Sequence, residues 1–296
     1  MTGDGHGQFT STTTPVLGAA VTTQFVGATA GFLDGDKKAD PVIITTNSNG
    51  DPNLTVMLSS SGSPPEAATY TIGSSPGGVV LADLDGKNGL DIAVSDAAGS
   101  VYMLWNDGSG AFAVSSPIAT GLGAHGIAAG DLDQDGQIDL VTADSTANTV
   151  TLLFNRNGFT NAGMPLGVGM NPVGVAVGDV TGDGVPDLVV TNQKDSTVSV
   201  YFNKADHTGG FLRGSDVAVY GAGRVALADL NGDGASEILV AGGGPLELIP
   251  ALGGHKLGPV LHYDTNGAFA VTTGDLDGDG KLDVATGGFA GFVTLP

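Results

Sequence analysis

The sequence predicts an all-β protein, a six-bladed β-propeller of four-stranded antiparallel blades, with seven blades as the alternative. Three observations support this. An acidic loop recurs six times, with its last acidic residue at Asp40, Asp91, Asp139, Asp187, Glu237 and Asp283. Each loop is followed by short apolar, β-prone stretches. The 50 glycines and 14 prolines indicate many tight turns, and we find no long amphipathic helical pattern.

Each repeat of about 48 residues reads as four short strands. In the fourth repeat we expect strands at 173–178, 188–192 and 197–202, and a further strand beginning at 211. The acidic loop joins the first strand to the second, and polar or glycine-rich turns join the others. Four short strands in a period of about 40 to 50 residues are typical of one propeller blade.

The two ends of the chain indicate that the propeller closes. Residues 3–9 are similar to residues 106–112, which link a third strand to a fourth, whereas residues 291–296 read as a third strand. We therefore expect the N-terminal and C-terminal strands to share one blade, which hides sheet edges. The prediction is one domain over residues 1–296.

The acidic loop itself predicts a metal site. In its third copy, Asp131, Asp133, Asp135 and Asp139 occupy positions one, three, five and nine, and such closely spaced carboxylates repel one another without a cation. Oxygen ligands at this spacing suit calcium. An EF-hand is excluded, because its twelfth position would be Thr142 instead of glutamate and the flanking residues have no helical period.

We expect positions one, three, five and nine to offer side-chain oxygens and position seven to offer its backbone carbonyl. Four copies fit well: Asp131, Asp133, Asp135, Gln137 and Asp139; Asp179, Thr181, Asp183, Val185 and Asp187; Asp229, Asn231, Asp233, Ala235 and Glu237; Asp275, Asp277, Asp279, Lys281 and Asp283. These ions are expected to brace the hairpins rather than to catalyse a reaction.

The first two copies are weaker candidates. The first copy has Phe32 at position one and keeps Asp34, Asp36 and Asp40. The second copy has Lys87 at position five, beside the following candidates: Asp83, Asp85 and Asp91. The Lys87 ammonium could lie among these carboxylates and take the place of the ion.

Six loops of the form Asp-x-Asp-x-Asp-Gly-x-x-Asp at this period, each followed by an apolar strand, resemble the FG-GAP or VCBS repeat. That repeat builds the head of integrin α chains and many secreted bacterial and fungal proteins, including some lectins. The resemblance covers nearly the whole chain. It implies a calcium-binding β-propeller that is secreted or displayed at the cell surface.

Composition narrows the choice of partners. The formal net charge of −21, with ten Lys and Arg, argues against nucleic acid and anionic membranes. There is no cysteine, and we see no apolar run long enough for a membrane helix. No signal peptide is visible, so we expect a mature or excised extracellular domain, and we expect a monomer.

We expect the ligand on the face opposite the acidic loops, because loops on a rigid scaffold usually carry function. The candidates in the links of that face are His125, Asn171, Arg224 and Asn266. Trp105, the single tryptophan, is assigned to packing. The function that we predict is a calcium-stabilised binding or adhesion module for glycan or protein.

Two alternatives remain, a carbohydrate-active enzyme similar to a polysaccharide lyase and a structural spacer of a larger secreted protein. The sequence gives no positive sign of an enzyme, because the five histidines are dispersed and no nucleophile, zinc or phosphate motif occurs.

Overall fold

A computed structural model describes residues 2–3, 9–10, 24–46, 51–59, 66–87, 89–156, 158–159, 164–265, 267–288 and 291–295. All regular elements in this part of the chain are β-strands. Consequently, no helix here has the length and apolar character to cross a bilayer. The chain divides into two compact units, Ala20–Pro172 and a second unit of Met1–Ala19 with Val173–Pro296.

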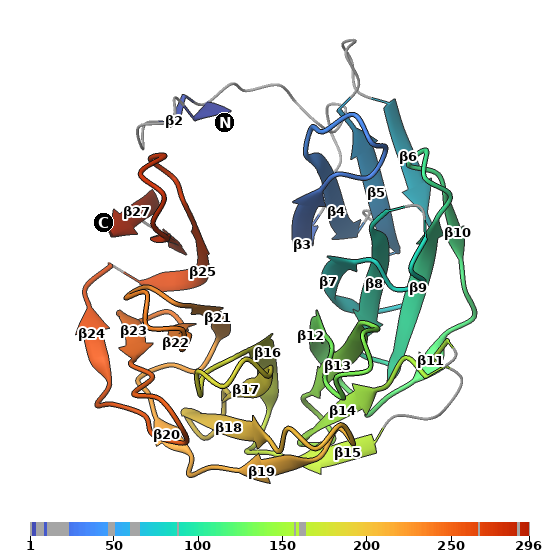
Figure 1. Cartoon of the computed structure of the whole chain (residues 1–296). Coiled ribbons are helices and arrows are strands. Elements are labelled where there is room, and N and C mark those ends of the chain that lie inside the picture. Colours follow the sequence, from blue (N-terminus) through green and yellow to red (C-terminus); the bar gives the residue numbers. More distant parts are fainter. Residues whose placement is uncertain are drawn as a thin grey trace. The chain divides into compact units, whose positions relative to one another are not determined.

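The unit Ala20–Pro172 contains three antiparallel sheets (Figure 1). The first sheet consists of β3 (Gln24–Gly31), β4 (Asp40–Thr46), β5 (Pro52–Leu58) and β6 (Glu66–Tyr70). The second consists of β7 (Pro76–Ala82), β8 (Asp91–Asp96), β9 (Ser100–Asn106), β10 (Phe112–Val114) and β11 (Ile118–Ala119). The third consists of β12 (Ala124–Gly130), β13 (Asp139–Asp144), β14 (Thr149–Leu153) and β15 (Met164–Gly167).

The other unit also contains three such sheets and a two-stranded ladder of β1 (Thr2–Gly3) with β2 (Phe9–Thr10). One sheet consists of β16 (Pro172–Gly178), β17 (Asp187–Asn192), β18 (Thr197–Asn203), β19 (Phe211–Arg213) and β20 (Val217–Ala218). The next consists of β21 (Arg224–Ala228), β22 (Glu237–Ala241), β23 (Leu246–Ile249) and β24 (Leu261–Tyr263). The last consists of β25 (Ala268–Gly274), β26 (Asp283–Gly288) and β27 (Gly291–Leu295).

Strands that follow one another in the sequence are neighbours in each sheet, except that β11 pairs with β9 and β20 pairs with β18. The acidic loop always joins the first strand to the second; Gly130, for example, is paired with Asp139 across the third loop. The prediction of an all-β chain built from repeated antiparallel sheets is therefore confirmed. The flanking strands also exclude the EF-hand, as expected.

The fourth strand differs from the simple prediction in two sheets, where it is split in two. Arg213 pairs with Tyr201 and Val217 pairs with Val198. The outer strand therefore advances four residues, from 213 to 217, where β18 advances only three, from 198 to 201. The same mismatch occurs between β9 and the pair β10 and β11. One extra residue opposite a regular strand is a β-bulge, which bends the outer strand.

The core of each unit lies between neighbouring sheets. In the unit Ala20–Pro172 the first strands β3, β7 and β12 contact one another in turn, and in the other unit β21 contacts β25. Every residue of the second strands β8, β13, β17 and β22 is buried. Such strands are covered on both faces, which explains their nearly continuous apolar sequences.

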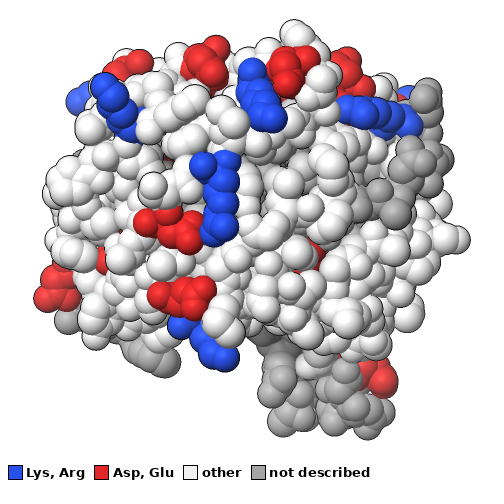
Figure 2. Space-filling view, turned by 90° about the horizontal axis from the view of Figure 1, so that it is seen from below, with Lys and Arg blue, Asp and Glu red and all other residues white. Residues whose placement is uncertain are grey.

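The charged side chains on one face of the molecule include both signs. On the face drawn in Figure 2, Lys and Arg lie singly, and several have an Asp or Glu beside them. An extended basic patch, the usual footprint of nucleic-acid binding, is not visible on this face.

Candidate metal centres

The carboxylate at position nine of each acidic loop is tied to the backbone. The oxygens of Asp139 accept the N–H of Leu132 at 2.8 Å and the N–H of Asn155 at 2.7 Å. The same pair of bonds is made by Asp40 with Leu33 and Ser59, by Asp91 with Leu84 and Asn106, and by Asp187 with Val180 and Asn203. Position nine therefore joins its own loop to the end of the third strand, where unpaired buried N–H groups would be costly.

The last two loops keep part of this pattern. Asp283 accepts the N–H of Leu276 at 2.9 Å. Glu237 accepts the N–H of Leu230 at 2.9 Å, and its other oxygen accepts the Asn231 side-chain amide at 3.0 Å. The extra methylene of Glu237 thus turns the second oxygen back toward its own loop.

Burial makes the charge at position nine unfavourable. It raises the pKa of Asp139 to about 6 and the pKa of Asp187 to about 6, with a smaller contribution from the neighbouring loop carboxylates. Burial also raises the pKa of Asp91 and of Glu237. A cation beside these groups would relieve this cost, because it favours the ionised form.

The carboxylate at position one organises the turn of the loop. The two oxygens of Asp179 accept the N–H of Gly182 and the N–H of Gly184, each at 2.7 Å. Both glycines have a positive φ, 77° and 83°, which explains the glycine in the motif. The N–H groups of the loop, led by that of Gly234, hold the pKa of the equivalent Asp229 below its usual range.

Position five is oriented by position seven. Gln137, Val185, Ala235 and Lys281 donate their N–H groups at 2.8–2.9 Å to Asp135, Asp183, Asp233 and Asp279 respectively. This leaves the second carboxylate oxygen of position five for other partners; in the third loop it accepts the Gln137 side-chain amide at 3.1 Å. The carbonyls of position seven remain predicted ligands.

Carboxylate oxygens from three residues converge to within 4.8 Å in four loops. The groups are Asp34, Asp36 and Asp40; Asp83, Asp85 and Asp91; Asp131, Asp133 and Asp139; and Asp275, Asp277 and Asp279. The first two loops, which the sequence ranks lower, thus also bring three carboxylates together, and like the third loop they include position nine, which the group of the sixth loop does not. The fourth and fifth loops have Thr181 and Asn231 at position three, so a neutral oxygen replaces one carboxylate there.

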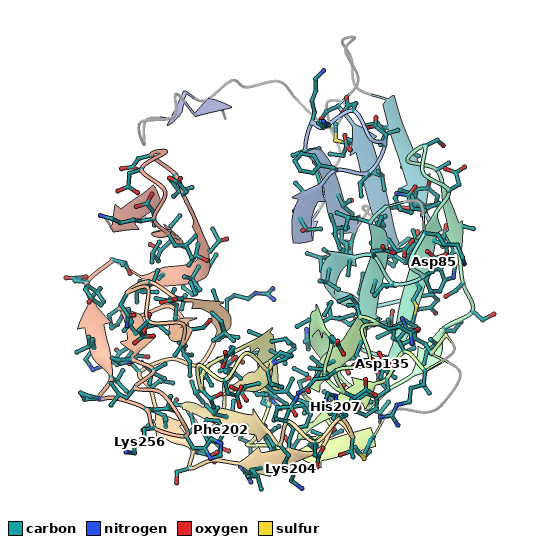
Figure 3. The ribbon with its side chains drawn as sticks, in the orientation of Figure 1. Asp85, Asp135, Phe202, Lys204, His207 and Lys256 are labelled. Atoms are coloured by element: carbon teal, nitrogen blue, oxygen red, sulfur yellow. The ribbon has the colours of Figure 1, made fainter. Side chains whose placement is uncertain are left out.

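Lys87 does not sit deep within the second loop. Its ammonium lies 3.4 Å from Asp85, and 69% of its side chain is exposed. Figure 3 labels Asp85 in this loop and Asp135 in the third loop. The carboxylates of the second loop nevertheless converge, so Lys87 pairs with the cluster from its solvent side.

The third loop contains a buried carboxylate oxygen without a partner. Asp133 is only 3% exposed, and one of its oxygens accepts the Nε–H of Arg156 at 2.7 Å. The other oxygen, Oδ1, is buried and has no hydrogen-bond partner. Because Asp133 belongs to the converging group of this loop, the donor set fits an oxygen-binding cation.

The residues predicted for the opposite face are held by turn and strand contacts. His125 lies on β12 and its carbonyl accepts the Ser95 hydroxyl at 2.7 Å. Asn171 has a φ of 55° in the turn before β16, and its N–H is donated to the Asn148 side chain at 2.8 Å. Arg224 is exposed at the start of β21. Asn266 lies outside the described residues.

An asparagine that ties neighbouring repeats together was not predicted from the sequence. The side-chain amide of Asn155 donates to the carbonyl of Leu84 in the preceding loop at 2.7 Å and to that of Ile138 at 3.2 Å. Asn106 bonds in the same way to Leu33 and Leu90. The available signal was an aromatic residue followed by Asn at the end of the third strand. Trp105, in the same motif, packs against a core cluster, as predicted.

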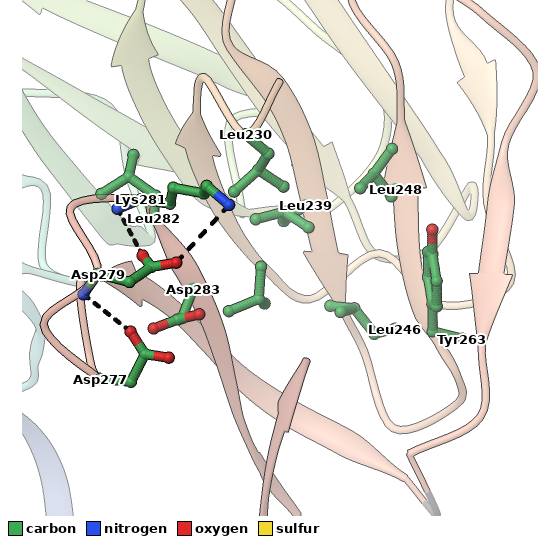
Figure 4. A pocket seen from close by; sticks show the side chains of 11 residues that line it. Leu230, Leu239, Leu246, Leu248, Tyr263, Asp277, Asp279, Lys281, Leu282 and Asp283 are labelled. Carbon is green, nitrogen blue, oxygen red and sulfur yellow. Dashed lines mark hydrogen bonds and ion pairs between the residues drawn. The ribbon is translucent and has the colours of Figure 1, made fainter. Parts of the chain in front are cut away.

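A hollow of about 380 Å³ lies beside the sixth acidic loop (Figure 4). Its apolar wall comes from Leu230, Leu239, Leu246 and Leu248, and its polar side includes Asp279, whose carboxylate is 3.7 Å from the Lys281 ammonium. The hollow contains no converging set of polar groups other than the loop itself, so it belongs with the sixth candidate metal centre.

Comparison with known proteins identifies the repeat. Residues 83–142, 131–190, 179–240 and 229–286 match the model of the FG-GAP-like repeat, which together covers most of the chain. A search among curated proteins finds no match.

Two solved structures are similar in fold. BBS1N, from its complex with ARL6DN, is 13% identical with a TM-score of 0.57, and the match covers 90% of both chains. An Agrocybe aegerita lectin, described as recognising non-reducing terminal N-acetylglucosamine, is 20% identical with a TM-score of 0.54; the match covers 89% of this chain and 70% of the lectin. At these identities the likeness concerns the fold alone.

Proposed function

The chain belongs to the FG-GAP-like repeat family of β-propellers, and from this premise we propose that it is a calcium-stabilised extracellular module that binds a glycan or a protein. Repeats of this family occur in extracellular proteins. Oxygen-only calcium sites of modest affinity suit millimolar extracellular calcium. The two structural neighbours, one a lectin and one a protein in a complex, support a binding role rather than a catalytic one.

The observation that carries the calcium assignment is the buried, unpartnered Oδ1 of Asp133. A buried charged oxygen without a partner is strongly unfavourable, and Arg156 satisfies only the other oxygen. Calcium at this loop would supply the missing charge compensation, with Asp131, Asp135, Asp139 and the Gln137 carbonyl as further ligands. The same assignment extends to the fourth, fifth and sixth loops, with the first two as weaker sites.

The test is calorimetric titration of chelator-treated protein with calcium, together with thermal unfolding. We expect several bound ions per chain and a large rise in melting temperature, because a ligand that binds only the folded state stabilises it. Magnesium should substitute poorly, since it tolerates irregular ligand sets less well. Asp133→Ala, which leaves no ligand oxygen at position three, is expected to remove one ion from the stoichiometry. An unchanged melting temperature after chelation would exclude the assignment.

For the ligand we retain the face opposite the acidic loops and its candidates His125, Asn171, Arg224 and Asn266. The test is a glycan array combined with affinity capture of extracellular proteins, followed by single alanine substitutions at these residues. If a ligand still binds after each of the four substitutions, this face is not its binding site.

We further infer that residues 1–296 form one monomeric propeller with six blades, closed by strands from both ends. In the described part of the chain β27 pairs only with β26, so its outer edge is available for a strand from the N-terminal region. Deleting residues 1–23 should then lower the denaturant midpoint and promote association through the open edge. A truncated protein that is equally stable and monomeric by light scattering would contradict closure.

A further inference from the structure

A hollow of about 690 Å³ lies between the outer strands of one sheet and a turn of the next. Its walls come from β18, β19 and β20 and from the turn at 252–258, all within the same compact unit. Phe202 lies at the end of β18, and Lys256 marks the turn (Figure 3). This hollow is separate from every candidate metal centre.

The polar wall of the hollow is a fixed Arg–Asp pair. One terminal nitrogen of Arg213 lies 3.1 Å from both carboxylate oxygens of Asp216. The hydroxyl of Ser199, which is fully buried, donates to Asp216 at 2.9 Å. Asp216 is therefore held by Ser199 and Arg213, and the guanidinium carbon lies 5.9 Å from the centroid of the Tyr201 ring. The guanidinium has further N–H donors, and it lies beside a carboxylate that can still accept.

Phe202 and His255, which also line the hollow, form an aromatic stack. His255 lies on the ring of Phe202 with the centroids 4.5 Å apart and the planes at 16°. Phe202 is buried, whereas His255 is exposed, so one face of the imidazole is supported and the other is accessible. The turn that carries His255 is held in place, because Gly254 donates its N–H to the carbonyl of Thr181 at 2.8 Å. Both walls are preorganised.

The Arg–Asp pair is not needed to form the bulged outer strand. In the matching hairpin of β9 with β10 and β11, the residues in the same register are Val114 and Pro117. That hairpin makes the same backbone bond across the bulge, Ser115 N–H to the Met103 carbonyl, as Gly214 makes to Val200. The charged pair is thus an addition to a bulge that also forms with apolar residues.

We propose that this hollow binds a neutral pyranose ring of a glycan, as a site additional to the face opposite the acidic loops; the inference rests on the glycan arm of the proposed function. Vicinal hydroxyls require a donor and an acceptor side by side, which Arg213 and Asp216 provide. The aliphatic face of the ring fits the imidazole of His255 and the apolar side chains of Leu212 and Leu257, which also line the hollow. Sites for small molecules commonly combine apolar walls with a few fixed polar groups in this way.

Charge favours a neutral sugar over an acidic one. Asp216 largely compensates Arg213, so the hollow offers no uncompensated cation for a carboxylate or sulfate. The chain has 31 Asp and Glu against ten Lys and Arg, so it stays net negative even with calcium in all six loops, and this repels anionic ligands. A uronic acid or a sulfated sugar is therefore disfavoured both locally and at long range.

The test is titration of the full chain, in calcium, with the methyl glycosides of glucose, galactose, mannose and N-acetylglucosamine, and with glucuronic acid as the anionic comparison. Saturation-transfer NMR detects binding, and calorimetry measures the dissociation constant. The variants are Arg213→Val, which copies the matching hairpin, and His255→Ala. Lys204→Ala, in the exposed turn that follows β18, is the matched control.

We expect at least one neutral glycoside to bind, with affinity reduced about tenfold or more by Arg213→Val and by His255→Ala and unchanged by Lys204→Ala. Unaltered melting temperatures would show that the variants fold. Glucuronic acid binding as tightly as the neutral sugars would overturn the preference for neutral rings. Equal sugar affinity in wild type and both variants would overturn this site while leaving the proposed glycan function intact. If no glycoside binds, the hollow is not a pyranose site; binding on the glycan array or to a protein would then still support the proposed function.

Discussion

Arg156 bonds to one oxygen of the buried Asp133 carboxylate and leaves the other oxygen without a partner. The arginine follows Phe154 and Asn155 at the end of the third strand and lies over the Phe154 ring, with its guanidinium carbon 4.7 Å from the ring centroid. One side of Asp133 is therefore neutralised by the protein itself. The other oxygen is buried without a partner, and Asp133 belongs to the converging carboxylates of the third loop.

This arrangement predicts the effect of Arg156→Gln. Without calcium the variant should unfold more easily, by about 2 kcal/mol, because a charge-assisted hydrogen bond to a buried carboxylate is lost. Since one positive charge is removed beside the metal centre, calcium should recover more stability in the variant than in wild type. Urea unfolding with and without calcium measures both effects. Lys281→Gln, at an exposed pair in the sixth loop, is the control; equal effects of the two substitutions would contradict this role of Arg156.

Two carboxylates of the fourth loop should behave differently. Asp187 bonds to the N–H groups of Val180 and Asn203, so Asp187→Ala should cost about 3 kcal/mol even in chelator, because two buried donors lose their acceptor. Asp183 is exposed and bonds only within the loop. Asp183→Asn should therefore change little in chelator and should remove part of the stabilisation by calcium. Denaturation curves in chelator and in calcium separate these outcomes. A large loss of stability for Asp183→Asn in chelator would contradict the assignment of different roles to Asp187 and Asp183.

The pH dependence of stability should reverse when calcium is added. Burial raises the pKa of Asp139 and of Asp187 from 3.8 to about 6, so the folded protein binds protons more tightly than the unfolded chain. In chelator, lowering the pH from about 7.5 to about 5 should stabilise the fold by about 1.4 kcal/mol for each group. In excess calcium the same change should destabilise it, because protons compete with the ion for the carboxylates.

Melting temperature against pH, in chelator and in calcium, measures the two slopes. The double variant Asp139→Asn and Asp187→Asn, which cannot titrate at these positions, should flatten the slope in chelator. Parallel slopes in the two conditions would show that these carboxylates do not contact the ion.

The repeated sheets could be predicted because their signals are local. The turn glycines, the acidic positions and the apolar stretches all lie within one repeat, and their period identifies the fold. The division of roles within the loop could not be predicted. Asp139 bonds to Asn155, which lies 16 residues away, just after the third strand, and nothing in the loop sequence indicates that bond.

Longer-range contacts were the least accessible to sequence analysis. Arg156, which bonds to one oxygen of Asp133 and leaves the other without a partner, lies 23 residues later in the chain. The β-bulge of β19 and β20 depends on which residues of β18 find partners, and the sequence at 211–219 reads as one strand. The hollow brings Arg213 together with His255 from a different sheet. Such sites form only when sheets pack against one another, so they can be recognised only in the three-dimensional structure.

The bond from Gly254 to the carbonyl of Thr181 predicts that calcium at the fourth loop slows motion of the turn that carries His255. Thr181 occupies position three of that loop, so a bound ion should hold its backbone and with it the acceptor of the Gly254 N–H. Hydrogen exchange of Gly254 should therefore slow when calcium is added. Asp183→Asn, in the fourth loop, should abolish the slowing, whereas Asp279→Asn, in the sixth loop, should leave it unchanged. Slowing that persists in Asp183→Asn would show that the turn responds to overall stability and not to the fourth loop.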